Sequence, residues 1–108
     1  YGGTFMTSRP TDVVTLPIGY HDGLRRSFSG RLPVLIRGGR APIVGAVSMD
    51  LTLVDATDCG GAPGDRVVVI GRLGGNELTA WDLARAGGTI AYEIVCGIGS
   101  RVPRSYVP

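Results

Sequence analysis

Short apolar runs, separated by glycines and prolines, follow one another along most of the chain. Runs of this kind with turn residues between them are typical of an all-β sandwich or barrel. The 18 glycines among 108 residues indicate many tight turns. A hairpin turn is predicted at Arg37-Gly38-Gly39-Arg40, where paired glycines separate two apolar runs. Strands are predicted over residues 4–7, 12–19, 32–37, 41–47, 51–55, 66–70 and 102–107.

Two later segments depart from the strand pattern and predict short helices. Residues 79–86 begin at Thr79, a good N-cap, and stop at Gly87-Gly88, which suits a helix C-terminus. Residues 89–96 predict a second helix capped by Thr89, although its β-branched residues lower its helix propensity. The predicted fold is therefore mainly β: a small antiparallel β-barrel or sandwich with one or two short helices.

Length and composition limit the classes of protein to which the chain can belong. A chain of 108 residues fits one domain, residues 1–108, with its own core. Because it starts at Tyr1 without a Met or a signal sequence, we expect it to be part of a longer protein. No apolar run approaches the roughly 20 residues of a membrane-spanning helix. With a net charge of +2 and scattered arginines, a nucleic-acid surface is not expected either.

The basic residues and the cysteines also restrict the chemistry. All 11 basic residues are arginine, so the chain has no lysine for a Schiff base or an amine catalyst. Cys59 and Cys96 lie far apart and form no Cys-x-x-Cys motif. We interpret both as free thiols of a cytoplasmic protein, with a disulfide between them as the alternative.

Common catalytic motifs are not convincing in this sequence. His21 is the only histidine, and its Tyr-His-Asp-Gly context is more typical of a turn than of a hydrolytic triad. One histidine and two distant cysteines do not give the spacing of a metal site. The glycines of residues 71–75 and 97–99 do not complete a phosphate-binding motif, and hairpin turns explain them better. These tests alone indicate only a small β-domain.

Longer motifs, in a fixed order, are more informative. Together they closely resemble the signature segments of alanine racemase C-terminal domains over essentially the whole chain. The motifs are Tyr1-Gly2-Gly3-Thr4-Phe5, Pro17-Ile18-Gly19-Tyr20-His21-Asp22-Gly23, the segments 41–50 and 89–96, and the closing Arg101-Val102-Pro103-Arg104.

The resemblance implies a role for individual residues. Tyr1 would be the catalytic tyrosine base of the family, specific for the L-enantiomer. Met49 would offer its backbone N–H to the substrate carboxylate. The substrate entryway would be formed by Tyr20, Arg26, Asp50, Ile90 and Tyr92. Without the motifs, Tyr20 and Tyr92 would be interpreted as ordinary half-buried aromatics and Met49 as core filler.

The resemblance also implies a cofactor and a partner. Pyridoxal phosphate stabilises the carbanion left when an amino acid loses its α-proton. In the family a barrel domain, absent from this chain, binds the cofactor through a lysine, and the β-domain of the partner subunit delivers the tyrosine in a head-to-tail homodimer. The implied function is interconversion of L- and D-alanine, which supplies D-alanine for the cell wall. This chain alone is expected to be inactive.

Two positions depart from the family pattern and leave alternatives open. Ala46 stands where relatives often carry an arginine of the entryway, and His21 replaces a small residue. The parent could therefore be a serine racemase or a broad-specificity amino-acid racemase. A non-catalytic β-barrel binding module is the alternative from a different class.

Overall fold

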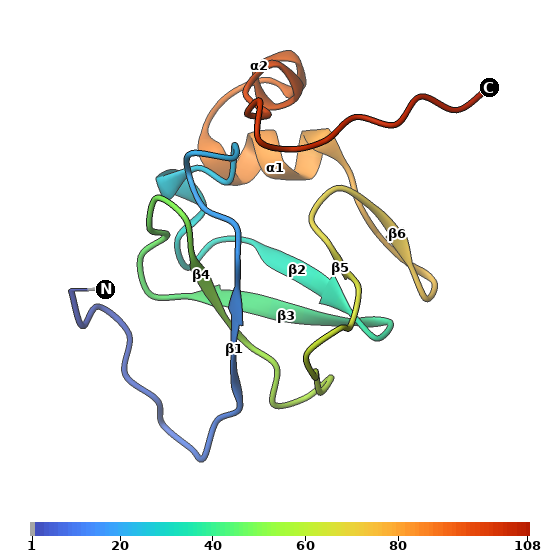
Figure 1. The fold of residues 1–108 in the computed structure, drawn as a ribbon. Helices are drawn as coiled ribbons and strands as arrows, with labels where there is room; N and C mark the ends of the chain where they lie inside the picture. Colours follow the sequence, from blue (N-terminus) through green and yellow to red (C-terminus); the bar gives the residue numbers. More distant parts are fainter. Residues whose placement is uncertain (1) are drawn as a thin grey trace.

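The computed structural model describes residues 2–108, and Tyr1 lies outside the described residues. Five strands form one antiparallel sheet in the order β1-β4-β3-β2-β5, and two more form a separate hairpin. The sheet curls into a half-barrel, with both helices at one end of it (Figure 1). The fold class predicted from the sequence is confirmed. The strands are β1 (Val13–Leu16), β2 (Pro33–Ile36), β3 (Gly39–Val44), β4 (Thr52–Asp55), β5 (Val67–Val68), β6 (Gly71–Leu73) and β7 (Asn76–Leu78).

The predicted hairpin turn joins β2 to β3. Ile36 pairs with Gly39, so Arg37 and Gly38 form the two-residue loop. Both loop residues have positive φ angles, 53° and 79°, as the tight turns that match strand twist require. An ion pair of 2.8 Å between Arg37 Nε and Asp65 accompanies the unusual backbone of Arg37.

Side chains from the strands and from both helices form one common core. Val34, Leu35 and Ile36 on β2 are buried together with Ile43 on β3 and Val54 on β4. Leu83 and Ile94 from the two helices complete the same cluster. Each fully buried aliphatic side chain stabilises the fold by about 1.5–3 kcal/mol relative to an exposed one. The remaining members are Leu16, Leu24, Phe28, Leu32, Ala41, Val47, Leu78 and Ala84.

The helices begin and end close to the predicted positions. Helix α1 (Ala80–Gly87) is capped by Thr79, whose hydroxyl accepts the Asp82 N–H while the Asp82 carboxylate accepts the Thr79 N–H. Gly88 ends it in a left-handed conformation. Helix α2 (Ala91–Cys96) is capped by Ile90, so the prediction of Thr89 as its cap is wrong by one residue. The Thr89 hydroxyl instead donates to the Glu93 carboxylate.

Three other local predictions are wrong. Residues 4–7 and 102–107 form no strand, because neither segment finds a partner; the first is exposed and the second carries Pro103. Residues 97–99 follow helix α2 and form no hairpin. The β6–β7 hairpin was not predicted as strands, although its turn at Gly74-Gly75 lies inside the predicted turn at 71–75. The C-terminal segment extends away from the body of the molecule (Figure 1).

Candidate active-site surface

Two loops far apart in the sequence are joined by their backbones. One follows β1 and carries Tyr20, and the other precedes β4 and carries Met49. The Tyr20 N–H donates to the carbonyl of Ser48, and the His21 N–H donates to the carbonyl of Met49, both at 3.0 Å. Tyr20 and Met49 are therefore neighbours, and they are 46% and 49% exposed to solvent. The exposure of Met49 argues against its alternative reading as core filler.

The backbone N–H of Met49 is the notable group of the second loop. The turn is closed by the Ser48 N–H, which donates to the carbonyl of Leu51. No acceptor within residues 2–108 receives the Met49 N–H, whereas the Met49 carbonyl is bonded. An unpaired backbone donor at an exposed turn is free to bind an acceptor from outside the chain.

A third loop joins the first two through an arginine. Arg101 Nε donates to Asp22 Oδ1 at 2.9 Å, and Arg101 Nη2 lies 2.7 Å from Asp50 Oδ1. The other oxygen of Asp22 accepts the Gly19 N–H at 3.1 Å, and Asp22 is buried. The pKa of Arg101 lies above its ordinary value, because Asp50 first and then Asp22 accept hydrogen bonds from its guanidinium.

The loop that carries Arg101 is itself held in place by hydrogen bonds. The Gly99 N–H donates to the Asp22 carbonyl at 2.9 Å. Arg104 donates to the carbonyls of Ile98, Gly99 and Val102. Three segments, residues 19–23, 48–51 and 97–104, thus form one hydrogen-bonded unit, which we call the loop cluster.

Helix α2 carries Tyr92 and is preceded by Ile90, the other two residues expected in the entryway. Ile90 and Tyr92 are 55% and 74% exposed. The alternative interpretation of Tyr92 as an ordinary half-buried aromatic therefore does not describe it. Arg25, just after the first loop, pairs with Glu93 at 2.8 Å and also donates to the Glu93 carbonyl. The pKa of Glu93 is lowered by the hydrogen bond from the Thr89 hydroxyl and then by Arg25.

The link between the tyrosines is indirect. Within residues 2–108, no hydrogen bond joins Tyr92 to Tyr20 or Met49. Helix α2 is connected to the first loop through Arg25 and through the close packing of Gly23 on the carbonyl of Gly97. The structure brings Tyr20, Met49 and Asp50 together through their two loops. Tyr92 on α2 and Ile90, which precedes this helix, are linked to the first loop only through these neighbouring contacts.

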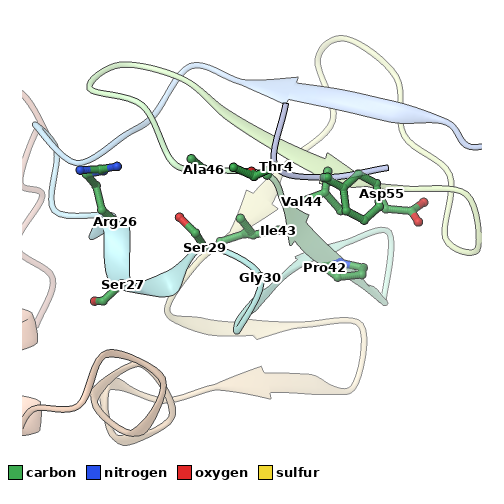
Figure 2. A pocket seen from close by; sticks show the side chains of 12 residues that line it. Thr4, Arg26, Ser27, Ser29, Gly30, Pro42, Ile43, Val44, Ala46 and Asp55 are labelled. Atoms are coloured by element: carbon green, nitrogen blue, oxygen red, sulfur yellow. The ribbon is translucent and has the colours of Figure 1, made fainter. Parts of the chain in front are cut away.

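Arg26 lies in a separate open cavity of about 780 Å³. It belongs to the 3-10 helix η1 (Arg26–Phe28), and Figure 2 shows its guanidinium at one end of the cavity beside Ala46, with Asp55 at the other end. Arg26 makes no ion pair within residues 2–108. Thr4 and Phe5, which follow Tyr1 closely in the sequence, also line this cavity. Tyr1 itself lies outside the described residues.

The chain does not fit covalent attachment of a pyridoxal cofactor. It contains no lysine, so no side chain can form the required Schiff base. No group of three metal-ligating side chains is found within residues 2–108. Cys59 and Cys96 are free thiols. None of the described helices has the length and apolar character to cross a membrane.

The roles implied by the sequence motifs do not include the residues that organise the loop cluster. Asp22, Arg101 and Arg104 lie inside the motifs quoted above, but the sequence gives no sign that they contact one another. Arg101 and Asp22 are 79 positions apart. The sequence shows Asp22 only as an aspartate in a glycine-containing turn. Its burial, which requires partners for the carboxylate, becomes known only from the structure.

Solved structures identify the class of domain that this fold and loop cluster define. The chain is similar over 100% of its length to 28% of alanine racemase from Bacillus anthracis with bound L-Ala-P, with a TM-score of 0.93 and 39% identity. It also matches 29% of alanine racemase from Bartonella henselae with covalently bound pyridoxal phosphate, with a TM-score of 0.88 and 38% identity over 99% of this chain.

Sequence comparison leads to the same class and gives the family. The chain is 53% identical to alanine racemase of Symbiobacterium thermophilum over 98% of its length and 50% identical to alanine racemase 2 of Caldanaerobacter subterraneus subsp. tengcongensis over 99%. It spans 28% of the length of both relatives. The family described as alanine racemase, C-terminal domain, matches residues 1–106, and the chain belongs to that family.

Proposed function

We propose that this chain is the domain of a pyridoxal-phosphate-dependent alanine racemase that supplies one catalytic base and part of the substrate-binding surface. The parent protein would interconvert L- and D-alanine in the cytoplasm and supply D-alanine for the cell wall. The relatives named above are alanine racemases, and this chain corresponds to 28% of their length. The rest of the catalytic machinery would therefore lie in other parts of the protein.

The observation that carries the proposal is the unpaired N–H of Met49. It lies in an exposed turn beside Tyr20, within a loop cluster held by hydrogen bonds. A fixed backbone donor binds a carboxylate without the entropy cost of ordering a side chain. Met49 would thus hold the substrate carboxylate, while Tyr20, Arg26, Asp50, Ile90 and Tyr92 would line the path to it.

Tyr1 would be the base that moves the proton at the α-carbon of L-alanine. Racemisation needs a proton acceptor on each face of the α-carbon, and this chain would provide one of them. A phenol ionises near pH ~10 in water, so it acts as a base near neutrality only beside positive charge or hydrogen-bond donors. Arg26 shares a cavity with Thr4 and Phe5, which belong to the segment that begins at Tyr1.

The cofactor would be held outside this chain. Pyridoxal phosphate, when bound, supplies the electron sink that makes the α-proton acidic. With no lysine, the chain cannot carry the cofactor covalently and cannot supply the second base as an amine. A head-to-tail homodimer, in which each β-domain serves the partner's cofactor site, would complete the catalytic machinery. The isolated chain is accordingly expected to be inactive.

The test compares the full-length protein with the isolated 108-residue chain. The full-length protein should convert L-alanine to D-alanine. Reduction of its Schiff base with borohydride should fix the cofactor to a lysine outside this segment, which the masses of the peptides identify. The isolated chain, incubated with cofactor and borohydride, should show neither turnover nor added mass. A full-length protein that binds the cofactor but racemises no amino acid would refute the proposal.

Serine is the discriminating second substrate. Ala46 leaves the end of the cavity beside Arg26 without a large side chain, which is the observation that favours a broader racemase. A kcat/KM for L-serine equal to or above that for L-alanine would assign the parent to that class instead.

A further inference from the structure

One arginine spans the two loops that carry the proposed substrate-binding groups. Arg101 contacts Asp22, two residues after Tyr20, and Asp50, the residue directly after Met49. Its Nη2 atom lies 2.9 Å from Asp22 Oδ1 and 2.7 Å from Asp50 Oδ1. A single guanidinium therefore fixes the two carboxylates relative to each other.

The two carboxylates differ in how firmly the rest of the chain holds them. Asp22 is buried, and it is bonded to the Gly19 N–H and, through its carbonyl, to the Gly99 N–H. The Asp50 side chain is 48% exposed and, within residues 2–108, Arg101 is its only ion-pair partner. Arg101 thus connects the exposed end of the Met49 turn to a buried anchor.

Arg101 is well placed to act as a rigid connector. Its own loop is held by Arg104 and by the Gly99 N–H. The planar guanidinium presents several donors in a fixed arrangement, so it can serve two carboxylates at once. A lysine ammonium is a single point charge on a flexible stem and would hold such a pair less well.

We propose that Arg101 is a positioning residue for substrate binding: by holding Asp22 and Asp50 together, it fixes the backbone N–H of Met49 where a substrate carboxylate is received. This inference rests on the proposed function. Arg101 would touch neither the substrate nor the cofactor. Because the carboxylate is common to both enantiomers, its effect would be the same for L- and D-alanine.

The test uses the full-length protein with Arg101→Gln, Arg101→Lys and a matched control, Arg72→Gln. Arg72 also forms an ion pair, with Glu77, but on the exposed β6–β7 hairpin outside the loop cluster. Loss of binding that is equal in ground state and transition state raises KM and leaves kcat unchanged. Arg101→Gln should therefore raise KM for both enantiomers about three- to tenfold with kcat changed less than about twofold. Arg101→Lys should be intermediate, and Arg72→Gln should match the wild type.

A double-mutant cycle with Asp50→Asn separates positioning from other effects. If Arg101 acts on the Met49 turn through Asp50, the KM effects of Arg101→Gln and Asp50→Asn will not add, because both break the same contact. A purely structural role would lower the amount of active protein and its unfolding temperature with KM unchanged. That result, or fully additive KM effects, would overturn the inference.

Amide hydrogen exchange gives a readout that does not depend on activity. Arg101→Gln should speed exchange in peptides that cover residues 48–51, and Arg72→Gln should not. If the wild-type protein does not racemise alanine, the proposed function fails, and this measurement alone decides whether Arg101 orders the Met49 turn. Unchanged exchange at residues 48–51 in Arg101→Gln would reject the positioning role.

Discussion

Gly19 lies directly against the carbonyl oxygen of Ser48. A Cβ atom added to Gly19 would stand 2.2 Å from that oxygen and 2.5 Å from the carbonyl oxygen of Met49. Cβ atoms do not approach backbone oxygens so closely, and a backbone group cannot rotate aside as a side-chain tip can. The contact between the Tyr20 loop and the Met49 turn thus requires glycine at position 19.

Gly19→Ala should force these two loops apart. We expect a loss of about 1–3 kcal/mol in the free energy of unfolding of the full-length protein, as for overpacked sites, together with a higher KM for alanine. Denaturant unfolding and steady-state kinetics measure the two effects. Gly64→Ala is the control, because the φ of 93° strains an alanine there while the space around its Cβ position is open. Gly64→Ala should therefore lower stability without changing KM, and an equal rise in KM for both variants would contradict the packing argument.

Thr79→Ala should weaken the start of helix α1. The Thr79 hydroxyl accepts the Asp82 N–H at 3.1 Å, and this bond is one half of a reciprocal cap. Removing such a cap costs about 1 kcal/mol in the free energy of unfolding. Thr79→Ser keeps the hydroxyl and should retain most of the stability. A Thr79→Ala variant as stable as Thr79→Ser would show that the cap contributes nothing.

Asp82 should make the fold sensitive to acid. Its pKa lies below the ordinary value, first because the Thr79 N–H donates to its carboxylate and second because the Thr79 hydroxyl does. A carboxyl group with a lowered folded-state pKa stabilises the fold above its unfolded pKa of about 3.9. That contribution is lost as the pH falls through the folded-state pKa, so the affected window lies below about pH 4.

The measurement for Asp82 is the free energy of unfolding between pH 5 and pH 3. Asp82→Asn should be less stable than the wild type at pH 5, and the difference should shrink toward pH 3. Asp12→Asn is the control, since the exposed Asp12 side chain makes no hydrogen bond within residues 2–108. A constant difference between wild type and Asp82→Asn across this range would show that ionisation of Asp82 does not contribute.

The sequence predicted those parts of the fold that depend on local chemistry. The Arg37-Gly38 turn and the Thr79 cap each need only a few adjacent residues of the right type, and both are found in the structure. Strand formation at residues 4–7 and 102–107 depends instead on a distant partner. Composition gives no information on whether that partner exists, which is why both predicted strands are wrong.

The candidate site shows the same division. Tyr20, Met49 and Tyr92 were selected only through the family resemblance, because each residue type is common in ordinary cores and surfaces. Their arrangement depends on loops that meet through the tertiary fold. The Arg101 contacts to Asp22 and Asp50 join three such loops, and no periodicity or local spacing predicts them.

Ala46→Arg should narrow the cavity in which Arg26 lies. Ala46 is partly exposed at the end beside Arg26, so an arginine there would occupy part of that space with a second positive charge (Figure 2). If this cavity leads to the substrate, kcat/KM for L-serine should fall about tenfold more than that for L-alanine, since serine is larger. Ala62→Arg, at an exposed position in a different cavity, is the control. An unchanged serine-to-alanine ratio would exclude the cavity as a determinant of substrate size.

Tyr1→Phe in the full-length protein tests the assignment of the base. The substitution removes the phenolic oxygen and keeps the ring, so folding and cofactor content should be preserved. Loss of a general base commonly costs about 10²- to 10⁴-fold in rate. The second base, on the opposite face of the α-carbon, is left intact. Racemisation should fail, while the rate of α-proton exchange should fall less for D-alanine than for L-alanine.

The asymmetry between enantiomers is measured by deuterium exchange in heavy water, with each pure enantiomer supplied separately. Tyr106→Phe is the matched control, because Tyr106 is 91% exposed in the C-terminal segment and has no proposed role in the site. The control should exchange both enantiomers at wild-type rates. If Tyr1→Phe lost exchange of both enantiomers equally, or lost neither, Tyr1 would not be the base specific for L-alanine. A selective loss for L-alanine would instead assign to this small β-domain one of the two proton transfers of the reaction.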